Sequence, residues 1–69
     1  MISIRAPKIL IVDDDPWQRL GLMELISLGG YESYSVENGR KALEELHKYP
    51  REYHLVLMDL IMPELVLDN

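Results

Sequence analysis

The chain has 69 residues with seven basic and twelve acidic side chains, giving a net charge of −5 at pH 7, and 48% of its residues are hydrophobic. This length and composition indicate one small folded domain, and the acidic balance argues against binding to nucleic acid or to an anionic membrane surface. The absence of cysteine excludes disulfides and thiolate metal sites and favours a cytoplasmic location, and no apolar run is long enough for a transmembrane helix.

The first half of the chain predicts a strand followed by a helix. Residues 8–12 form a short apolar run rich in β-branched side chains, typical of a strand buried on both faces, and the run stops at Asp13-Asp14-Asp15. Asp15 and Pro16 are favoured residues for the start of a helix. Gly29-Gly30 predicts its end. The apolar stripe of this helix consists of Leu22, Leu25, Ile26 and Leu28.

The second half predicts strand, helix and strand again. Residues 31–36 contain aromatic and β-branched side chains among polar ones, and their weaker hydrophobicity indicates an edge strand. A turn follows at residues 37–39. Residues 40–48 predict a helix, with Pro50 after its end and Ala42, Leu43 and Leu46 on one face. Residues 54–58 are a second apolar run that ends in an acid, Asp59.

This order of elements predicts an α/β fold of the type β-α-β-α-β. Strands that alternate with helices form a parallel sheet with right-handed crossovers. We expect the strand order 2-1-3, which is half of a doubly wound sheet. Ligands of such sheets bind beyond the carboxyl ends of the strands, where the strand order reverses. We therefore expect Asp13, Asp14 and Asp59 to meet there.

Clustered carboxylates repel one another and favour a bound cation. Mg²⁺ suits a site with only oxygen ligands, and a carboxylate beside it can attack phosphorus to form an acyl phosphate. The residues thus predict an Mg²⁺-dependent phosphoryl acceptor at Asp13, Asp14 and Asp59. For Asp15 the structural role of helix cap is the better interpretation.

Two segments, from Ile9 to Pro16 and from Leu57 to Glu64, resemble motifs of the receiver domain of two-component response regulators. Asn38-Gly39 followed by Ala42-Leu43 is also similar to the turn and helix after the family's second strand. The resemblance covers residues 8–64 and is specific because both motifs occur in order. It implies a flavodoxin-like fold and a role in phosphorelay signalling.

The resemblance also implies individual roles. Asp59 corresponds to the phosphorylated aspartate, Asp14 to the direct ligand of the metal, and Asp13 to the acid that reaches the metal largely through water. Ile61 corresponds to the residue that offers its backbone carbonyl to the metal. The phosphoryl donor would be a sensor histidine kinase or a small molecule such as acetyl phosphate. The chain would be a signalling module and not an enzyme.

The sequence departs from the family after the third strand, so residues 1–69 are expected to form an incomplete receiver domain. The family's Ser or Thr after the fourth strand and its Lys and aromatic residue of the fifth are absent, and residues 65–69 replace its usual Asp-Gly turn. Loss of one positioned charge typically costs about 3 kcal/mol of transition-state stabilisation. Arg5 and Lys8 lie at the wrong end of the first strand to substitute for it.

Alternative functions remain open at this point. A receiver-like module could bind a kinase or other regulators without being phosphorylated. A metal-dependent phosphatase with Asp13 and Asp15 as a D-x-D motif is disfavoured, because Pro16-Trp17 replaces that family's Gly-Thr.

We also expect self-association through the apolar region from Leu55 to Leu67, since an exposed hydrophobic edge strand invites pairing. His47 and His54 have no ligand spacing and receive no catalytic role.

Overall fold

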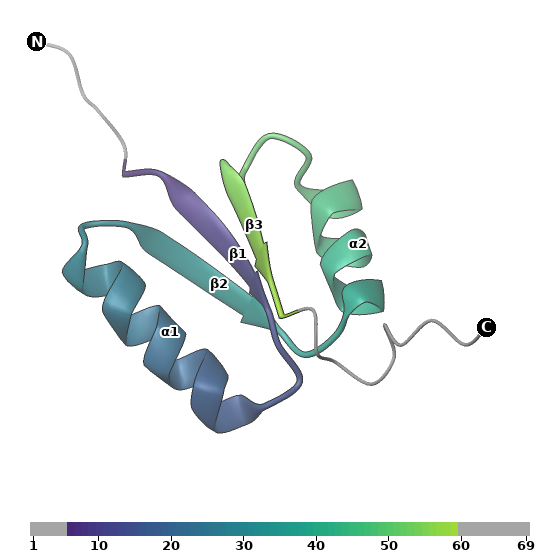
Figure 1. Ribbon diagram of the computed structural model, residues 1–69. Coiled ribbons are helices and arrows are strands. Elements are labelled where there is room, and N and C mark those ends of the chain that lie inside the picture. Colours follow the sequence, from purple (N-terminus) through teal and green to yellow (C-terminus); the bar gives the residue numbers. More distant parts are fainter. Residues whose placement is uncertain (1–5, 60–69) are drawn as a thin grey trace, which may run out of the picture.

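The computed structural model describes residues 6–59 of the chain. It contains five elements, each within one residue of its predicted bounds (Figure 1). None of the helices in this range is long and apolar enough to span a membrane. The elements are β1 (Lys8–Val12), α1 (Pro16–Leu28), β2 (Glu32–Val36), α2 (Gly39–Lys48) and β3 (Leu55–Met58).

The three strands form one parallel sheet in the order β2-β1-β3. In the central strand β1, Val12 lies opposite Val36 of β2 on one side and opposite Met58 of β3 on the other. The helices α1 and α2 lie on opposite faces of this sheet (Figure 1), because the right-handed crossovers from β1 to β2 and from β2 to β3 run in opposite directions across it. The predicted α/β architecture, half of a flavodoxin-like doubly wound sheet, is confirmed.

Both ends of α1 follow from local sequence. The Asp15 carboxylate accepts hydrogen bonds from the backbone N–H groups of Trp17 at 3.0 Å and Gln18 at 3.4 Å, and Pro16 occupies the first helical position. At the other end only Gly30 adopts a positive φ, of 89°. Gly29 keeps a right-handed conformation as the C-cap. The left-handed residue that ends the helix is therefore the second glycine of the pair.

The start of α2 depends on a cap that the sequence analysis placed only in a turn. The Asn38 side-chain oxygen accepts a hydrogen bond of 2.8 Å from the Lys41 backbone N–H. Asparagine is a favoured N-cap because this bond satisfies an N–H group that the helix itself leaves free. The turn at residues 37–39 therefore serves as the entry to α2.

The hydrophobic core lies between β1 and α2. Leu10 and Val12 are fully buried on this face and pack with Val36 and Ala42. Partly buried side chains complete the cluster from one side, namely Leu46, Tyr53 and Met58. The core is small because only one short helix covers this face in the described residues.

Much of the apolar surface of α1 and β3 is exposed in the described residues. The α1 stripe is only partly buried at Leu22 and Ile26, and Leu25 and Leu28 are 66% and 84% exposed. The apolar strand β3 is exposed as well, with Leu55 56% exposed, as expected for a hydrophobic edge strand. The reason is geometric: in the order β2-β1-β3 the described part of β3 has β1 on one side only. An apolar run can therefore lie at an edge.

Candidate functional site

The sheet places two acidic residues at neighbouring strand ends. The Asp13 backbone N–H, one residue after β1, donates a hydrogen bond of 3.1 Å to the Val36 carbonyl. The Asp59 backbone N–H, one residue after β3, donates one of 3.0 Å to the Val12 carbonyl. Each aspartate thus extends the hydrogen-bond ladder of its strand. Both are held at the carboxyl edge of the sheet by the backbone and not by flexible loops.

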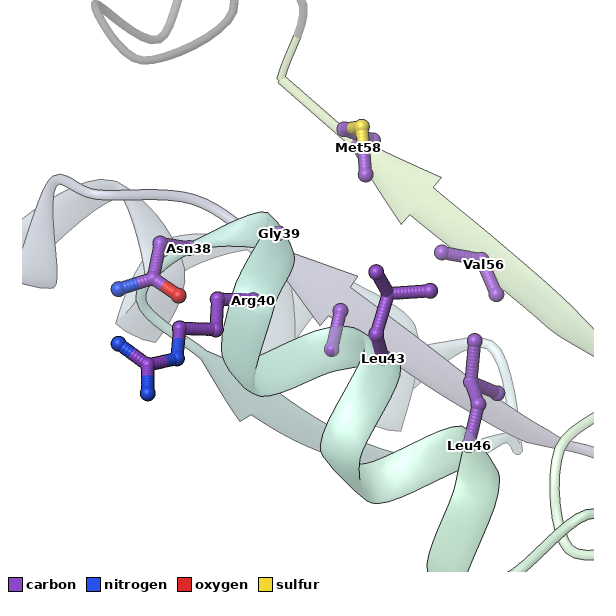
Figure 2. Close-up of a pocket in the computed structure, with 8 residues that line it drawn as sticks. Asn38, Gly39, Arg40, Leu43, Leu46, Val56 and Met58 are labelled. Atoms are coloured by element: carbon purple, nitrogen blue, oxygen red, sulfur yellow. The ribbon is translucent and has the colours of Figure 1, made fainter.

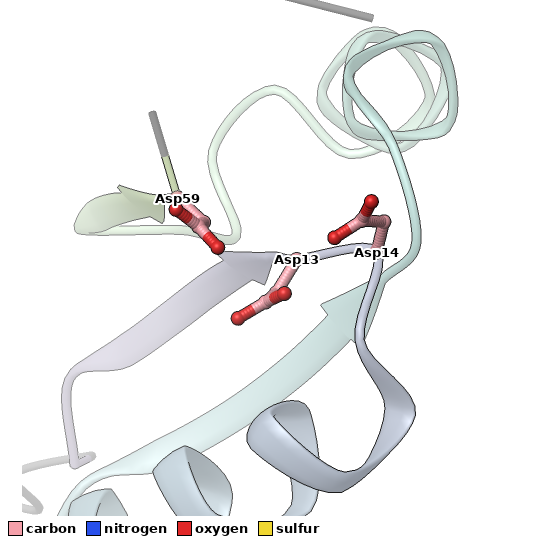
Figure 3. A group of neighbouring side chains, drawn as sticks. All are labelled: Asp13, Asp14 and Asp59. Carbon is pink, nitrogen blue, oxygen red and sulfur yellow. The ribbon is translucent and has the colours of Figure 1, made fainter. Parts of the chain in front are cut away.

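Asp14 joins these two residues to form an acidic cluster, defined here as Asp13, Asp14 and Asp59 (Figure 3). One carboxylate oxygen from each residue lies within 4.8 Å of the others. Asp13 is fully buried, Asp59 is half-buried and Asp14 is exposed. The cluster is therefore anchored in the protein at Asp13 and open to solvent at Asp14.

The buried carboxylate of Asp13 is only partly satisfied by the protein. Its Oδ1 atom accepts a hydrogen bond of 2.9 Å from the Asp15 backbone N–H. Its Oδ2 atom is buried and has no hydrogen-bond partner among the described residues. Buried polar atoms are almost always paired, because an unpaired one loses its hydration without compensation. Oδ2 is thus a candidate ligand atom for a cation.

The donor set of the cluster fits a hard divalent cation. All three side chains offer carboxylate oxygens, which are the ligands of Mg²⁺, and the three negative charges repel one another when no cation separates them. The exposed side at Asp14 leaves room for the waters that Mg²⁺ retains. The residues present therefore fit the predicted metal.

The remaining sequence predictions for this site have different outcomes. Ile61, predicted to offer a backbone carbonyl, and Arg5 lie outside the described residues. Lys8 begins β1 at the end opposite Asp13, and its Nζ atom lies 5.3 Å from the centroid of the Tyr53 ring. Lys8 therefore lies too far along the sheet to act on the acidic residues at its carboxyl edge. Asp15 is the helix cap, as expected.

Arg19 is a residue next to this site that no sequence motif predicted. Its Nη1 atom donates a hydrogen bond of 2.7 Å to the backbone carbonyl of Asp13. Arg19 is one helical turn after the cap Asp15, and that spacing brings a long side chain back towards the start of the helix. The spacing of one helical turn between Asp15 and Arg19 is the sequence signal that could have placed Arg19 near the site.

An apolar groove lies apart from the acidic cluster, between α2 and β3 (Figure 2). Its volume is about 670 Å³. The sheet side is formed by Val56 and Met58, and Leu43 and Leu46 of α2 point towards them. These side chains carry no group that can bind a metal or transfer a phosphoryl group. The chemistry of the described residues therefore concentrates at the carboxyl edge of the sheet.

The fold and the acidic cluster together define a class of protein: a parallel α/β domain with carboxylates where its strand order reverses. Comparison with known families agrees with this class. The response regulator receiver domain family matches residues 9–66. The chain belongs to the receiver domain family of two-component signalling.

The chain is similar to proteins of several kinds. The chain is 39% identical over 62 residues to the sensor histidine kinase GacS of Pseudomonas protegens, covering 90% of this chain and 6% of that protein. It is 44% identical over 59 residues to the transcriptional regulatory protein CpxR homolog of Haemophilus influenzae, covering 84% and 24%. The chemotaxis protein CheY of Thermotoga maritima is 37% identical over 59 residues, covering 84% and 48%.

The chain thus spans less than half the length of each of these three relatives. What they share with it is the receiver segment. No solved structure gives a significant match to the chain.

Proposed function

We propose that this chain accepts a phosphoryl group on Asp59 in an Mg²⁺-dependent reaction. The observation that carries the proposal is the acidic cluster, in which one oxygen from each of three carboxylates lies within 4.8 Å of the others. In addition, Asp13 Oδ2 is buried and has no hydrogen-bond partner within residues 6–59. A structural role alone leaves this arrangement unexplained, because three negative charges brought close together repel one another.

The three residues would have distinct roles. A carboxylate oxygen of Asp59 would attack the phosphorus atom, forming an acyl phosphate as the bond from phosphorus to the donor breaks. Asp13 and Asp14, with Asp59, would hold Mg²⁺, and Ile61 would offer its carbonyl. The bound ion would neutralise negative charge on the carboxylates and the incoming phosphoryl oxygens. Because Asp59 directly follows β3, the sheet would hold the backbone of the nucleophilic residue in place.

The partner implied by membership of the family is a sensor histidine kinase, and one relative is itself called a sensor histidine kinase. In this reaction the chain is a phosphoryl acceptor and a cytoplasmic signalling module. It is not a turnover enzyme, because Asp59 itself carries the product.

The test is the intact mass of the chain after incubation with acetyl phosphate and Mg²⁺, with and without a chelator. We expect a gain of one phosphoryl group that needs the metal and is lost in Asp59→Asn. Asp15→Asn is the matched control. It removes one negative charge beside the cluster but keeps the helix cap, because asparagine caps as well as aspartate. A gain in the Asp59→Asn variant would contradict the proposal.

The alternative is a receiver-like module that binds a kinase without being phosphorylated. It predicts no gain of mass in the same experiment, while Mg²⁺ still binds and Asp59→Asn leaves kinase binding intact. All three predictions can be measured on the unmodified chain and the Asp59→Asn variant, so one set of samples distinguishes the two functions.

A further inference from the structure

The Arg19 side chain reaches back from α1 to the end of β1. Its Nη1 atom donates a partly buried hydrogen bond of 2.7 Å to the backbone carbonyl of Asp13. Its own backbone N–H donates to the Asp15 carbonyl at 2.9 Å, within the first turn of α1. The start of the helix therefore places a guanidinium group next to the acidic cluster.

This bond completes the anchoring of Asp13. The Asp13 backbone N–H donates to the Val36 carbonyl at 3.1 Å, and its Oδ1 atom accepts from the Asp15 N–H at 2.9 Å. With the carbonyl bonded to Arg19, only Oδ2 is left without a hydrogen-bond partner in the described part of the chain. Hydrogen bonds thus hold the backbone nitrogen, the carbonyl oxygen and Oδ1 of Asp13 in place. The direction of Oδ2 is therefore set before any ion binds.

The same bond acts on Asp14. The Asp13 carbonyl lies in the peptide plane that also contains the Asp14 nitrogen, and this plane does not twist easily. By holding that carbonyl, Arg19 fixes the link between two members of the cluster. Arg19 is not itself a candidate ligand, because a guanidinium group has donors only and keeps its positive charge.

The charge of Arg19 acts in the opposite direction. A positive group near the cluster repels Mg²⁺. Its field extends to the loop after β2, where it adds to the hydrogen bond and charge of Lys41 in lowering the pKa of Glu37. Orientation and repulsion thus predict opposite results when the guanidinium is removed. If repulsion dominates, removal strengthens metal binding; if orientation dominates, removal weakens it.

We propose that Arg19 is a positioning residue, whose hydrogen bond to the Asp13 carbonyl holds the Asp13 and Asp14 carboxylates ready for a divalent cation. The inference rests on the proposed function, since it assumes that the cluster binds Mg²⁺. Residues that orient metal ligands typically contribute about ten-fold or more in metal affinity. Orientation therefore outweighs repulsion at Arg19.

The experiment measures Mg²⁺ affinity of the 69-residue chain by titration calorimetry, with Mn²⁺ binding followed by electron paramagnetic resonance as a second readout. Arg19→Met keeps the apolar stem but removes the donors and the charge. Arg19→Lys restores one donor and the charge. The matched control is Arg40→Met, which removes an arginine whose side chain is 89% exposed on α2. Amide exchange at Asp15 reports separately on the bond to Asp13 Oδ1.

We expect Arg19→Met to weaken Mg²⁺ binding by about ten-fold, Arg19→Lys to recover part of the loss, and Arg40→Met to bind as the unmodified chain does. Asp15 exchange should be faster in Arg19→Met, whereas exchange within α2 should not change. Equal or tighter binding by Arg19→Met would overturn the inference and leave the proposed function standing. If Arg19→Met does not fold, unchanged affinity and Asp15 exchange in Arg19→Lys overturn it. Failure of the unmodified chain to bind Mg²⁺ or Mn²⁺ would refute both.

Discussion

His54 and Lys8 are joined by two hydrogen bonds at the end of the sheet opposite the acidic cluster. The imidazole Nδ1 of His54 accepts from the Lys8 backbone N–H at 3.0 Å, and the His54 backbone N–H donates to the Lys8 carbonyl at 2.8 Å. The histidine side chain thus satisfies a backbone donor at the start of β1. The two bonds therefore tie the start of β3 to the start of β1.

We predict that His54→Leu lowers the free energy of unfolding by about 1 kcal/mol, because the Lys8 N–H loses its acceptor. Urea denaturation at pH 7.5 measures the change. His47→Leu, in the exposed last turn of α2, is the control and should stay within about 0.5 kcal/mol of the unmodified chain. Equal effects of the two substitutions would show that the side-chain bond contributes nothing.

Tyr53 and Glu45 give a prediction on alkaline pH. The Tyr53 hydroxyl donates a hydrogen bond to the Glu45 carboxylate, and burial together with this bond raises the pKa of Tyr53 above its ordinary value of 10. The neutral phenol therefore stabilises the fold. This contribution is fully present below the unfolded-state pKa, and it is lost as the pH rises through the folded-state pKa.

Tyr53→Phe is accordingly expected to lower stability by about 1 kcal/mol at pH 7. The difference from the unmodified chain should shrink above pH 10, the ordinary tyrosine pKa. Urea denaturation at a series of pH values checks this trend. A difference that grows with alkaline pH would have the wrong sign for a stabilised neutral phenol.

Two glycines should respond to alanine in opposite ways. Gly21 lies inside α1, and an added Cβ would meet no atom within 4 Å from other parts of residues 6–59. Gly21→Ala should therefore stabilise the fold by about 1 kcal/mol through helix propensity. Gly30 has a φ of 89°, and Gly30→Ala should destabilise it by about 1 kcal/mol through strain. Thermal unfolding of both variants tests the pair. A change of the same sign in both would contradict the assigned backbone roles.

Metal removal should expose the repulsion within the acidic cluster. In the presence of a chelator, Asp13→Asn should melt at a higher temperature than the unmodified chain, because one of three crowded negative charges is gone. Addition of Mg²⁺ should reverse the order. At a free concentration about one hundred times Kd, binding stabilises the folded state by about 2.7 kcal/mol. An equal response of both proteins to Mg²⁺ would place the ion elsewhere.

The exposed strand β3 leads to a prediction of self-association. Leu55 is 56% and Leu57 is 39% exposed along an apolar strand that pairs with β1 alone among the described strands. Residues 60–67 of the predicted contact surface lie outside the described part of the chain. We expect sedimentation velocity to show a mass that rises with concentration. Leu57→Lys should reduce it, because charges on edge strands oppose pairing. A chain that stays monomeric at all concentrations would contradict the prediction.

The sequence by itself determined the order of elements and the composition of the candidate site. Asp15 with Pro16, and Gly30 at the end of α1, are local signals that act over one helical turn, so they can be read without the fold. Two apolar runs that each end in aspartate predict the meeting of Asp13 and Asp59, because parallel neighbours share one edge of the sheet.

Only the tertiary structure decided how these residues are held and how deeply the apolar ones are buried. Full burial of Asp13 and the bond from Arg19 to its carbonyl depend on the packing of α1 against the sheet. The exposure of Leu25 and Leu57 likewise depends on which neighbours cover each face and edge. Hydrophobicity is a property of each side chain, whereas burial is a property of its surroundings, and these are assembled from residues far apart in the chain.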